Sequence, residues 1–367
     1  MLSRFSVTNY MGFPEKITWD LSKPHDYAFN SNLIHNGIVK NGIIYGVNGS
    51  GKTSLGKAVF DIVSLVNNVN PVDYGRVIYQ GAPNDPIDFE YSFVFDGGKK
   101  VDYSYSKNSQ GLIIKESLLY QGQKIFTKDI NEVYFCNEFS VNPIMRKKLA
   151  ENANAVSILK FIFSSYPLSK NHYIQLLMDF IGSMLWFRCL DERNYIGIDT
   201  SRVYIEDYII KHGYLNEFAK FIKEESGQEF DFTPTQDEDK VITCKIGNNA
   251  VPFLSVISTG TMSLELLFYW TKRMKEASVK FVFIDEFDAF FHYESAETIV
   301  LRLNKAKNFQ TILTTHNTYL MQNKLTRPDC CFIMTEGKIT NLFDSTDKEI
   351  REAHNLEKMY INGVFNA

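Results

Sequence analysis

The chain has 367 residues, of which 44% are hydrophobic, and its formal net charge is −4 at pH 7. This length and composition suffice for a substantial core and for two domains, and they exclude a low-complexity chain. No stretch approaches the roughly 18 unbroken apolar residues of a membrane span, and the amino end lacks the basic-then-apolar layout of a secretion signal. We therefore expect neither a membrane segment nor export.

The cysteines and the net charge bear on the cellular compartment of the protein and on its binding to nucleic acid. The five cysteines, at 136, 189, 244, 330 and 331, have no metal-ligand spacing, and their odd number gives no disulfide framework. A reducing cytoplasm is therefore the expected location. The net negative charge provides no global field that attracts nucleic acid, although a local basic groove in an assembled dimer is compatible with it. Direct contact with DNA is an alternative without support.

The most informative segment is Gly46-Val47-Asn48-Gly49-Ser50-Gly51-Lys52-Thr53, which fits the phosphate-binding pattern GxxxxGK[ST]. A short apolar strand at 42–45 precedes it, and apolar residues at helical spacing from Leu55 to Val66 follow it. The glycines permit positive φ angles and close backbone approach, so that N–H groups point at an anion. We predict that Lys52 reaches the β and γ oxygens and that Thr53 binds Mg²⁺. The predicted nucleotide contacts are Gly46, Asn48, Gly49, Ser50, Gly51, Lys52, Thr53 and Ser54.

The next part of the chain predicts a β lobe and then helices. Residues 86–126 alternate as antiparallel strands do, with turns at 96–98 and 121–123 and a stripe of aromatic residues that we interpret as core packing. Residues 132–136 are expected to return to the central sheet. Residues 141–244 are expected to be mainly helical, with apolar periodicity at 158–163, 174–187 and 214–222 and an acidic loop at 231–240. No stretch sustains three heptads, which excludes a long coiled-coil arm.

A second candidate phosphate contact begins at Ser258-Thr259-Gly260-Thr261, just before apolar residues at helix-like spacing. This pattern predicts a helix start that exposes hydroxyl groups and a glycine amide, and helix N-termini bind anions. We assign Ser258, Gly260 and Thr261 to nucleotide contact. An ordinary Ser/Thr helix cap is the alternative interpretation.

Two apolar runs that end in polar residues predict neighbouring core strands. The run at 280–286 ends in Asp285 and Glu286, as expected for a buried parallel strand with acids at its carboxyl end. Adjacent acids point to opposite sides, so we assign Asp285 to Mg²⁺ and Glu286 to the general base that polarises the attacking water. The run at 310–317 places His316 near the γ-phosphate, although a lone histidine after a strand is more often a surface or capping residue.

Together these motifs resemble the ABC-type ATPase heads of the SMC and RecF-like group and, more narrowly, the AAA_15/AAA_21 group. The opening FSVTNYMGF and the ending HNLEKMYINGVF resemble the same group. The resemblance implies an α/β fold, namely an ABC-type head with a mixed central sheet, an antiparallel β lobe and a compact helical insertion. The implied division is a P-loop lobe at 1–140, the insertion at 141–244 and a second lobe at 245–367.

The chain departs from the group's pattern in three places. Met11 stands where many members have a basic residue, and the signature lacks the double glycine of transporters. For the Q-loop glutamine, Gln80 and Gln121 are both candidates without a convincing context.

The resemblance also implies how such a chain acts. ATP and Mg²⁺ would be held between two copies, giving a homodimer or a higher homo-oligomer. Small ATPases of this kind occur in bacterial anti-phage modules such as PARIS, Septu and RloB-linked pairs, so we expect a sensor or scaffold that controls a separate TOPRIM- or HNH-type nuclease. The residues after His316 are too few for a second catalytic domain of ordinary size, and no Cys/His cluster suggests a zinc-stabilised nuclease.

Two other functions stay open at this point. One is a DNA-repair ATPase that acts directly on DNA, which predicts stimulation by DNA and strong salt dependence. The other is a GTPase switch, for which Asn323-Lys324-Leu325-Thr326 matches only half of the guanine-reading pattern.

Overall fold

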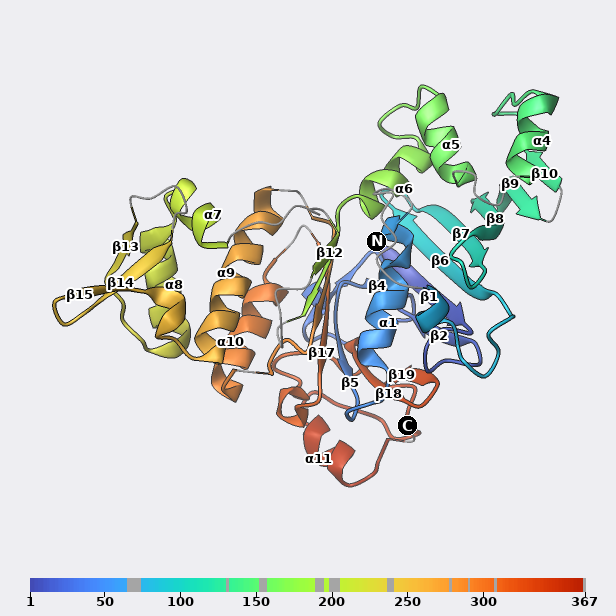
Figure 1. The fold of residues 1–367 in the computed structure, drawn as a ribbon. Helices are drawn as coiled ribbons and strands as arrows, with labels where there is room; N and C mark the ends of the chain where they lie inside the picture. Colours follow the sequence, from blue (N-terminus) through green and yellow to red (C-terminus); the bar gives the residue numbers. More distant parts are fainter. Residues whose placement is uncertain are drawn as a thin grey trace.

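The computed structural model describes residues 1–64, 74–129, 132–151, 157–188, 195–197, 205–235, 241–276, 279–289, 291–306 and 309–365. It confirms the predicted α/β fold class. A mixed central sheet carries helices on its faces, and a separate antiparallel sheet lies to one side of it (Figure 1). Val66 and residues 236–240 of the predicted acidic loop lie outside the described residues. Among the described residues, no helix has the length and apolarity needed to cross a membrane.

The central sheet brings the predicted motif strands together. Its five inner strands are parallel and its two edge strands are antiparallel, so the carboxyl ends of the inner strands share one edge. In spatial order the strands are β12 (Tyr195–Gly197), β11 (Met184–Arg188), β16 (Phe281–Asp285), β17 (Gln310–Thr315), β5 (Asn41–Tyr45), β18 (Cys331–Thr335) and β19 (Lys338–Asn341).

The antiparallel sheet contains the predicted hairpins, with turns at 96–98 and 121–123 as expected. Its spatial order is β10 (Glu132–Phe135), β9 (Gln123–Asp129), β8 (Ile113–Tyr120), β7 (Lys99–Lys107), β6 (Ile87–Phe95), β1 (Leu2–Thr8) and β2 (Ile17–Asp20). The expectation that residues 132–136 return to the central sheet is wrong, because β10 pairs with β9. A strand that follows its neighbour after so short a connection pairs most readily with that neighbour.

Alternate side chains of the central strands pack into two hydrophobic cores, one on each face of the sheet. On β5, Ile44 belongs to the core shared with the antiparallel sheet, whereas Ile43 and Tyr45 belong to the core beneath the helices of the other face. The aromatic stripe of β6 lies in the first core, where Phe89, Tyr91 and Phe93 are buried. Its interpretation as core packing is confirmed. Strands buried on both faces read as the continuous apolar runs seen in the sequence.

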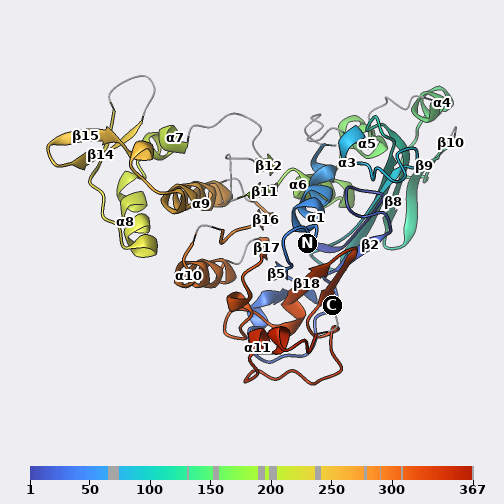
Figure 2. The ribbon, with the colours of Figure 1, turned by 60° about the horizontal axis from the view of Figure 1, so that its bottom comes forward.

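Helices cover the two faces unequally. On one face lie α1 (Lys52–Val59) and the 3-10 turn η2 (Phe60–Val63), toward the antiparallel sheet; on the other lie α9 (Thr259–Glu276) and α10 (Tyr293–Asn304), as Figures 1 and 2 show. The other α-helices of the described residues are α3 (Tyr74–Val77), α4 (Pro143–Glu151), α5 (Ile158–Ser165), α6 (Tyr173–Ile181), α7 (Ile205–Lys211), α8 (Leu215–Ser226) and α11 (Leu356–Ile361).

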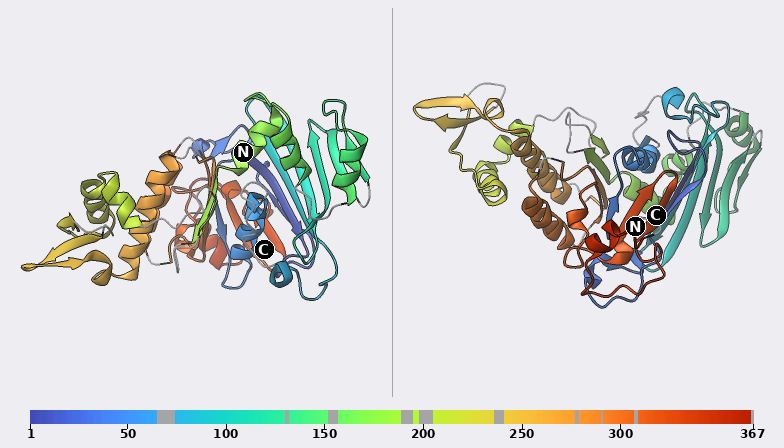
Figure 3. Two further views of the ribbon diagram at one scale, coloured as in Figure 1. Left: turned by 45° about the horizontal axis from the view of Figure 1, so that its top comes forward. Right: turned by 90° about the horizontal axis from the view of Figure 1, so that it is seen from below.

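Two small sheets complete the fold. The pair β3 (Ile34–His35) and β4 (Ile38–Val39) precedes the P-loop strand, and β13 (Phe232–Pro234), β14 (Ile242–Ile246) and β15 (Asn249–Pro252) form a three-stranded sheet. Figure 3 shows that this three-stranded sheet lies at the opposite end of the molecule from β6–β9.

The predicted helical insertion is less helical than expected. Helices α5 and α8 lie where periodicity predicted them, but the predicted helix at 174–187 ends with α6 at Ile181, and Met184–Arg188 forms β11 of the central sheet. A short apolar run suits a buried strand as well as a helix, so periodicity alone does not distinguish them. The division at 140 and 244 remains a proposal.

Candidate nucleotide site

The phosphate-binding loop connects β5 to α1, as its pattern predicted. Gly49 and Gly51 have φ angles of +83° and +99°, which L side chains rarely adopt. Gly46 is needed for close approach instead, because a Cβ atom there would clash with the Ser50 hydroxyl and lie 2.8 Å from the Met334 carbonyl oxygen. The loop is therefore a tight turn that requires glycine for two different physical reasons, positive φ angles and close packing.

Lys52 lies folded into this loop. Its Nζ donates to the carbonyl oxygens of Gly46 at 2.6 Å and Val47 at 3.1 Å, and the residue is buried. Burial lowers the pKa of the Lys52 ammonium, an effect partly opposed by the nearby carboxylates of Asp285, Glu286 and Asp288. Lys52 is thus a buried cation held by dipoles, at the place where a phosphate would give it a charged partner.

The proposed Mg²⁺ residues are in direct contact. Thr53 Oγ1 donates to Asp285 Oδ2 at 2.7 Å, and Thr314 Oγ1 donates to Asp285 Oδ1 at 2.6 Å. Asp285 is fully buried, and burial raises the pKa of its carboxyl group above the usual value. A hydroxyl and a buried carboxylate are the hard oxygen donors that Mg²⁺ prefers, and this ion commonly takes few protein ligands beside phosphate and water. The two residues therefore fit the ion.

Glu286 follows Asp285 and has an ion pair that the sequence analysis missed. Arg188, the last residue of β11, donates from Nε at 3.1 Å and from a terminal nitrogen at 2.7 Å to Glu286 Oε2. Sequence reasoning missed Arg188 because the apolar periodicity at 174–187 predicts a helix just before it and no strand of the central sheet. The parallel pairing of Arg188 with Asp285 explains the proximity.

Strand β17 lies between β16 and β5 and carries His316 just beyond its end. Thr315 Oγ1 donates to Asp288 Oδ2 at 2.8 Å, which ties the loop after β16 to the end of β17. Burial raises the pKa of Asp288. His316 itself is exposed, at the same sheet edge as the P-loop. Its role toward the γ-phosphate stays a prediction.

The predicted signature segment begins α9. Ser258 is exposed and accepts from the Thr261 backbone N–H at 3.2 Å, so it is the helix cap. Thr261 is buried, and its hydroxyl donates to Gln228 Oε1 at 2.9 Å. The three predicted contacts therefore differ in access: Ser258 is exposed, Gly260 is partly exposed and Thr261 is buried against Gln228.

The direction of α9 follows from its connection and its packing. The helix ends at Glu276 and β16 begins at Phe281, so the two run in opposite directions past one another. The Trp270 ring stacks on Phe187 of β11, with 5.7 Å between ring centroids. The turns before Trp270 extend roughly 16 Å further, at 1.5 Å per residue. The first turn of α9 thus projects beyond the sheet edge that carries the P-loop.

Neither candidate Q-loop glutamine is tied to the phosphate-binding loop by a described hydrogen bond. Gln80 donates to the carbonyl oxygens of Gly75 and Ile78, and Gln121 lies in the turn between β8 and β9 and donates to Gly98. The identity of this residue stays open.

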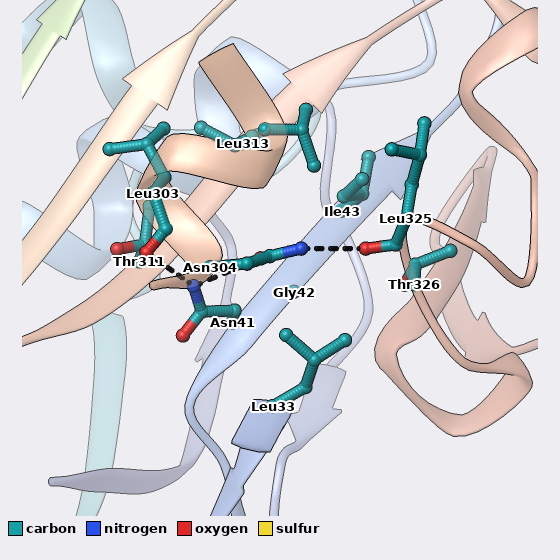
Figure 4. A pocket seen from close by; sticks show the side chains of 11 residues that line it. Leu33, Asn41, Gly42, Ile43, Leu303, Asn304, Thr311, Leu313, Leu325 and Thr326 are labelled. Carbon is teal, nitrogen blue, oxygen red and sulfur yellow. Dashed lines mark hydrogen bonds between the residues drawn. The ribbon is translucent and has the colours of Figure 1, made fainter. Parts of the chain in front are cut away.

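A small cavity near β5 is distinct from the nucleotide site. It is lined by side chains from the start of β5, from β17 and from the end of α10, among them Asn41, Asn304 and Thr311 (Figure 4). Asn41 Nδ2 donates to Asn304 Oδ1 at 3.1 Å beside it. Because Asn41 begins β5 whereas the P-loop follows its end, this cavity lies at the other edge of the sheet.

A comparison with protein families matches a segment that includes part of the candidate site. Residues 208–322 match the family model AAA_21, described as "AAA domain, putative AbiEii toxin, Type IV TA system". This AAA_21 segment contains Ser258, Asp285, Glu286 and His316, whereas the P-loop precedes it.

Several solved structures share the course of the backbone at low identity, and no curated protein matches the chain. The SMC head domain from Thermotoga maritima is 16% identical, with a TM-score of 0.44 over 93% of this chain and 98% of that one. The recombination mediator RecF is 12% identical, with a TM-score of 0.43 over 93% and 98%. An SMC head from Pyrococcus furiosus, bound to the C-terminal domain of ScpA, is 14% identical, with a TM-score of 0.42 over 94% and 97%.

Proposed function

We propose that the chain binds and hydrolyses ATP. The observation that carries the proposal is the contact between two distant motifs: Thr53, beside the P-loop lysine, donates to Asp285 at 2.7 Å, and Asp285 adjoins Glu286. A phosphate cradle, a pair of oxygen ligands and a carboxylate base are the parts that phosphoryl transfer to water requires. The sequence separation of 232 residues makes a chance meeting of these groups a poor explanation.

The P-loop residues would bind the phosphates. Lys52 exchanges the carbonyl oxygens of Gly46 and Val47 for the β and γ oxygens, gaining a charged partner in a buried place. The backbone N–H groups of 46–53 and the start of α1 complete the cradle, with the side chains of Asn48, Ser50 and Ser54 lying along it. Mg²⁺, bound by Thr53 and Asp285, would neutralise charge that develops on the phosphate oxygens.

Glu286 would take the proton from the attacking water. It lies at the carboxyl end of β16, next to the acid assigned to Mg²⁺, and its side chain is 16% exposed. A partly buried carboxylate at hydrogen-bond distance from water can act as a general base. His316, at the end of the neighbouring strand, would contact the γ-phosphate.

A second copy would complete the site. Ser258 and Gly260 project beyond the sheet edge at the start of α9, where a helix N-terminus favours a phosphate of another molecule. Exposed apolar side chains flank both surfaces: Val47 is 69% exposed in the P-loop, and Val256 and Met262 are 42% and 37% exposed beside Ser258. Interfaces bury such side chains at their centres. ATP would therefore join two chains, and hydrolysis would release them.

The cellular role rests on the resemblance of the motifs to ATPases of anti-phage modules. In this proposal the chain is a cytoplasmic sensor or scaffold that restrains a separate nuclease until infection. The AAA_21 model that matches residues 208–322 is described as a "putative AbiEii toxin" of a type IV toxin–antitoxin system, which is in keeping with a defence role. Purification of the native operon tests this part: a co-purifying nuclease supports it, and a lone ATPase without a neighbouring effector gene counts against it.

Measurement of phosphate release tests the ATPase itself. We expect Mg²⁺-dependent hydrolysis of ATP, and we expect Glu286→Gln to bind ATP with little change in Kd while hydrolysis falls by about a hundredfold or more. Glu294→Gln, an exposed glutamate of α10, is the matched control. Equal hydrolysis by Glu286→Gln and the unmutated chain would remove Glu286 as the base.

A further inference from the structure

Arg188 reaches both acids of the candidate site from a strand that none of the motifs includes. Its guanidinium donates twice to Glu286 Oε2, at 2.7 and 3.1 Å, and its Nε lies 3.8 Å from Asp285 Oδ2. The Arg188 side chain is 31% exposed and that of Glu286 is 16% exposed, so the pair lies partly shielded from water. Charge-assisted hydrogen bonds of this kind are among the stronger ones in proteins.

The backbone fixes where this pair sits. Strand β11 runs parallel to β16 with Arg188 opposite Asp285, so the next residue of β16's chain, Glu286, leaves the sheet beside the guanidinium. Glu286 has a φ angle of +48°, and its N–H donates to Thr314 Oγ1 at 2.8 Å. A non-glycine residue in this conformation persists when its surroundings hold it there. Backbone and side chain of Glu286 are thus both held.

The hydrogen bonds from Arg188 distinguish the two carboxylate oxygens of Glu286. Both of these hydrogen bonds from Arg188 go to Oε2, which leaves Oε1 outside this pair of bonds. Catalytic bases are commonly oriented by a neighbouring group that binds one side of the base. The other side of the base then faces the proton that it accepts.

We propose that Arg188 is a positioning residue that holds the Glu286 carboxylate in place for proton abstraction from water. This inference rests on the proposed function and adds a residue to it. The opposite effect of the same contact, in which Arg188 withholds Glu286 from the water, is an outcome of the test.

The test compares ATP hydrolysis by Arg188→Gln and Arg188→Lys with that of the unmutated chain. We expect Arg188→Gln to lower kcat by about tenfold to a hundredfold, the range of one charge-assisted hydrogen bond, with KM within about twofold. Lysine keeps the charge but not the two-pronged geometry, so Arg188→Lys recovers part of kcat. Arg302→Gln is the matched control, because Arg302 also pairs with a buried glutamate, Glu225, at 2.6 Å, but between α10 and α8.

A double variant separates positioning from a general structural effect. In long single-turnover incubations, Arg188→Gln added to Glu286→Gln should cause no further loss, because the group that Arg188 positions is already disabled. An equal loss in both backgrounds, or an unchanged or raised kcat in Arg188→Gln alone, would overturn the inference. If the unmutated chain does not hydrolyse ATP, the proposed function fails; if it does and only Arg188 proves dispensable, the positioning inference fails alone.

Discussion

At the scale of single residues, Lys52 is the most informative side chain. It is buried with its Nζ on two carbonyl oxygens of its own loop, and burial lowers its pKa. A buried ammonium whose hydrogen bonds go to carbonyl oxygens gains more from an incoming anion than an exposed lysine does. The loop therefore holds its cation at the position proposed for the phosphate.

Replacement of Lys52 by alanine should abolish nucleotide binding. The change removes the cation that faces the β and γ oxygens, so titration calorimetry with ATP should show a Kd at least about a hundredfold weaker, the scale of a lost buried charge pair. Lys57→Ala, on the next turns of the same helix, is the control and should bind ATP as the unmutated chain does. Undiminished binding by Lys52→Ala would contradict the assignment of the loop.

The backbone conformation of Gly51, in the same loop, leads to a prediction about the stability of a variant. Its φ angle is +99°, and a Cβ atom there would lie 2.8 Å from the Phe13 ring. Gly51→Ala should therefore lower the free energy of unfolding by about 1–3 kcal/mol and weaken ATP binding. Gly12→Ala, where a Cβ meets nothing within 4 Å, should be close to neutral in the same urea titration. Equal stability of the two variants would refute the strain argument.

At the scale of elements, the sequence predicted the helices and strands whose residue pattern fits only one type of secondary structure. The hairpins of β6 to β9, the start of α9 and the strands β16 and β17 lie where alternation, capping residues and apolar runs placed them. Strand β11 was missed because Met-Leu-Trp-Phe continues the apolar periodicity of α6, and only its pairing with β16 distinguishes strand from helix. The missed strand is also the one that carries Arg188.

A buried network connects the P-loop helix to the antiparallel sheet. Lys107 of β7 donates to Asp61 of η2 at 2.6 Å and to the Tyr74 hydroxyl at 2.6 Å, and Tyr105 donates to Asp61 at 2.7 Å. Both charged residues are nearly inaccessible, with side-chain exposures of 3% and 1%. A shift of β7 would therefore be transmitted to the turn that follows α1.

Removal of one partner of this pair should be costly. Lys107→Met leaves the Asp61 carboxylate buried without its cation, which typically lowers the free energy of unfolding by about 3–5 kcal/mol. Lys16→Met, in the exposed pair with Glu90, should cost less than about 1 kcal/mol. Chemical denaturation measures both, and similar small values for the two variants would show that the buried pair does not hold the two elements together.

At the scale of the whole molecule, the arrangement of the candidate nucleotide site was largely predictable from the sequence, and its partners were not. Lys52, Thr53, Asp285 and Glu286 belong to patterns whose chemistry requires those residue types, and β5 and β16 bring them to one edge of the sheet. Solvent exposure of a side chain depends on the tertiary structure. The burial of Thr261 and the exposure of His316 therefore did not follow from their motifs. What meets Ser258 depends on a surface outside the chain.

The central claim is that the start of α9 in one copy completes the P-loop site of another. Lys52→Ala disables the P-loop, and Gly260→Asp places a negative charge at the proposed phosphate contact while favouring the helix start. Each variant alone should be inactive. Mixed in equal amounts, they should recover hydrolysis, up to about a quarter of the unmutated rate, because half of the random pairs carry one intact composite site. A mixture as inactive as its components, from variants shown to be folded, would contradict the claim.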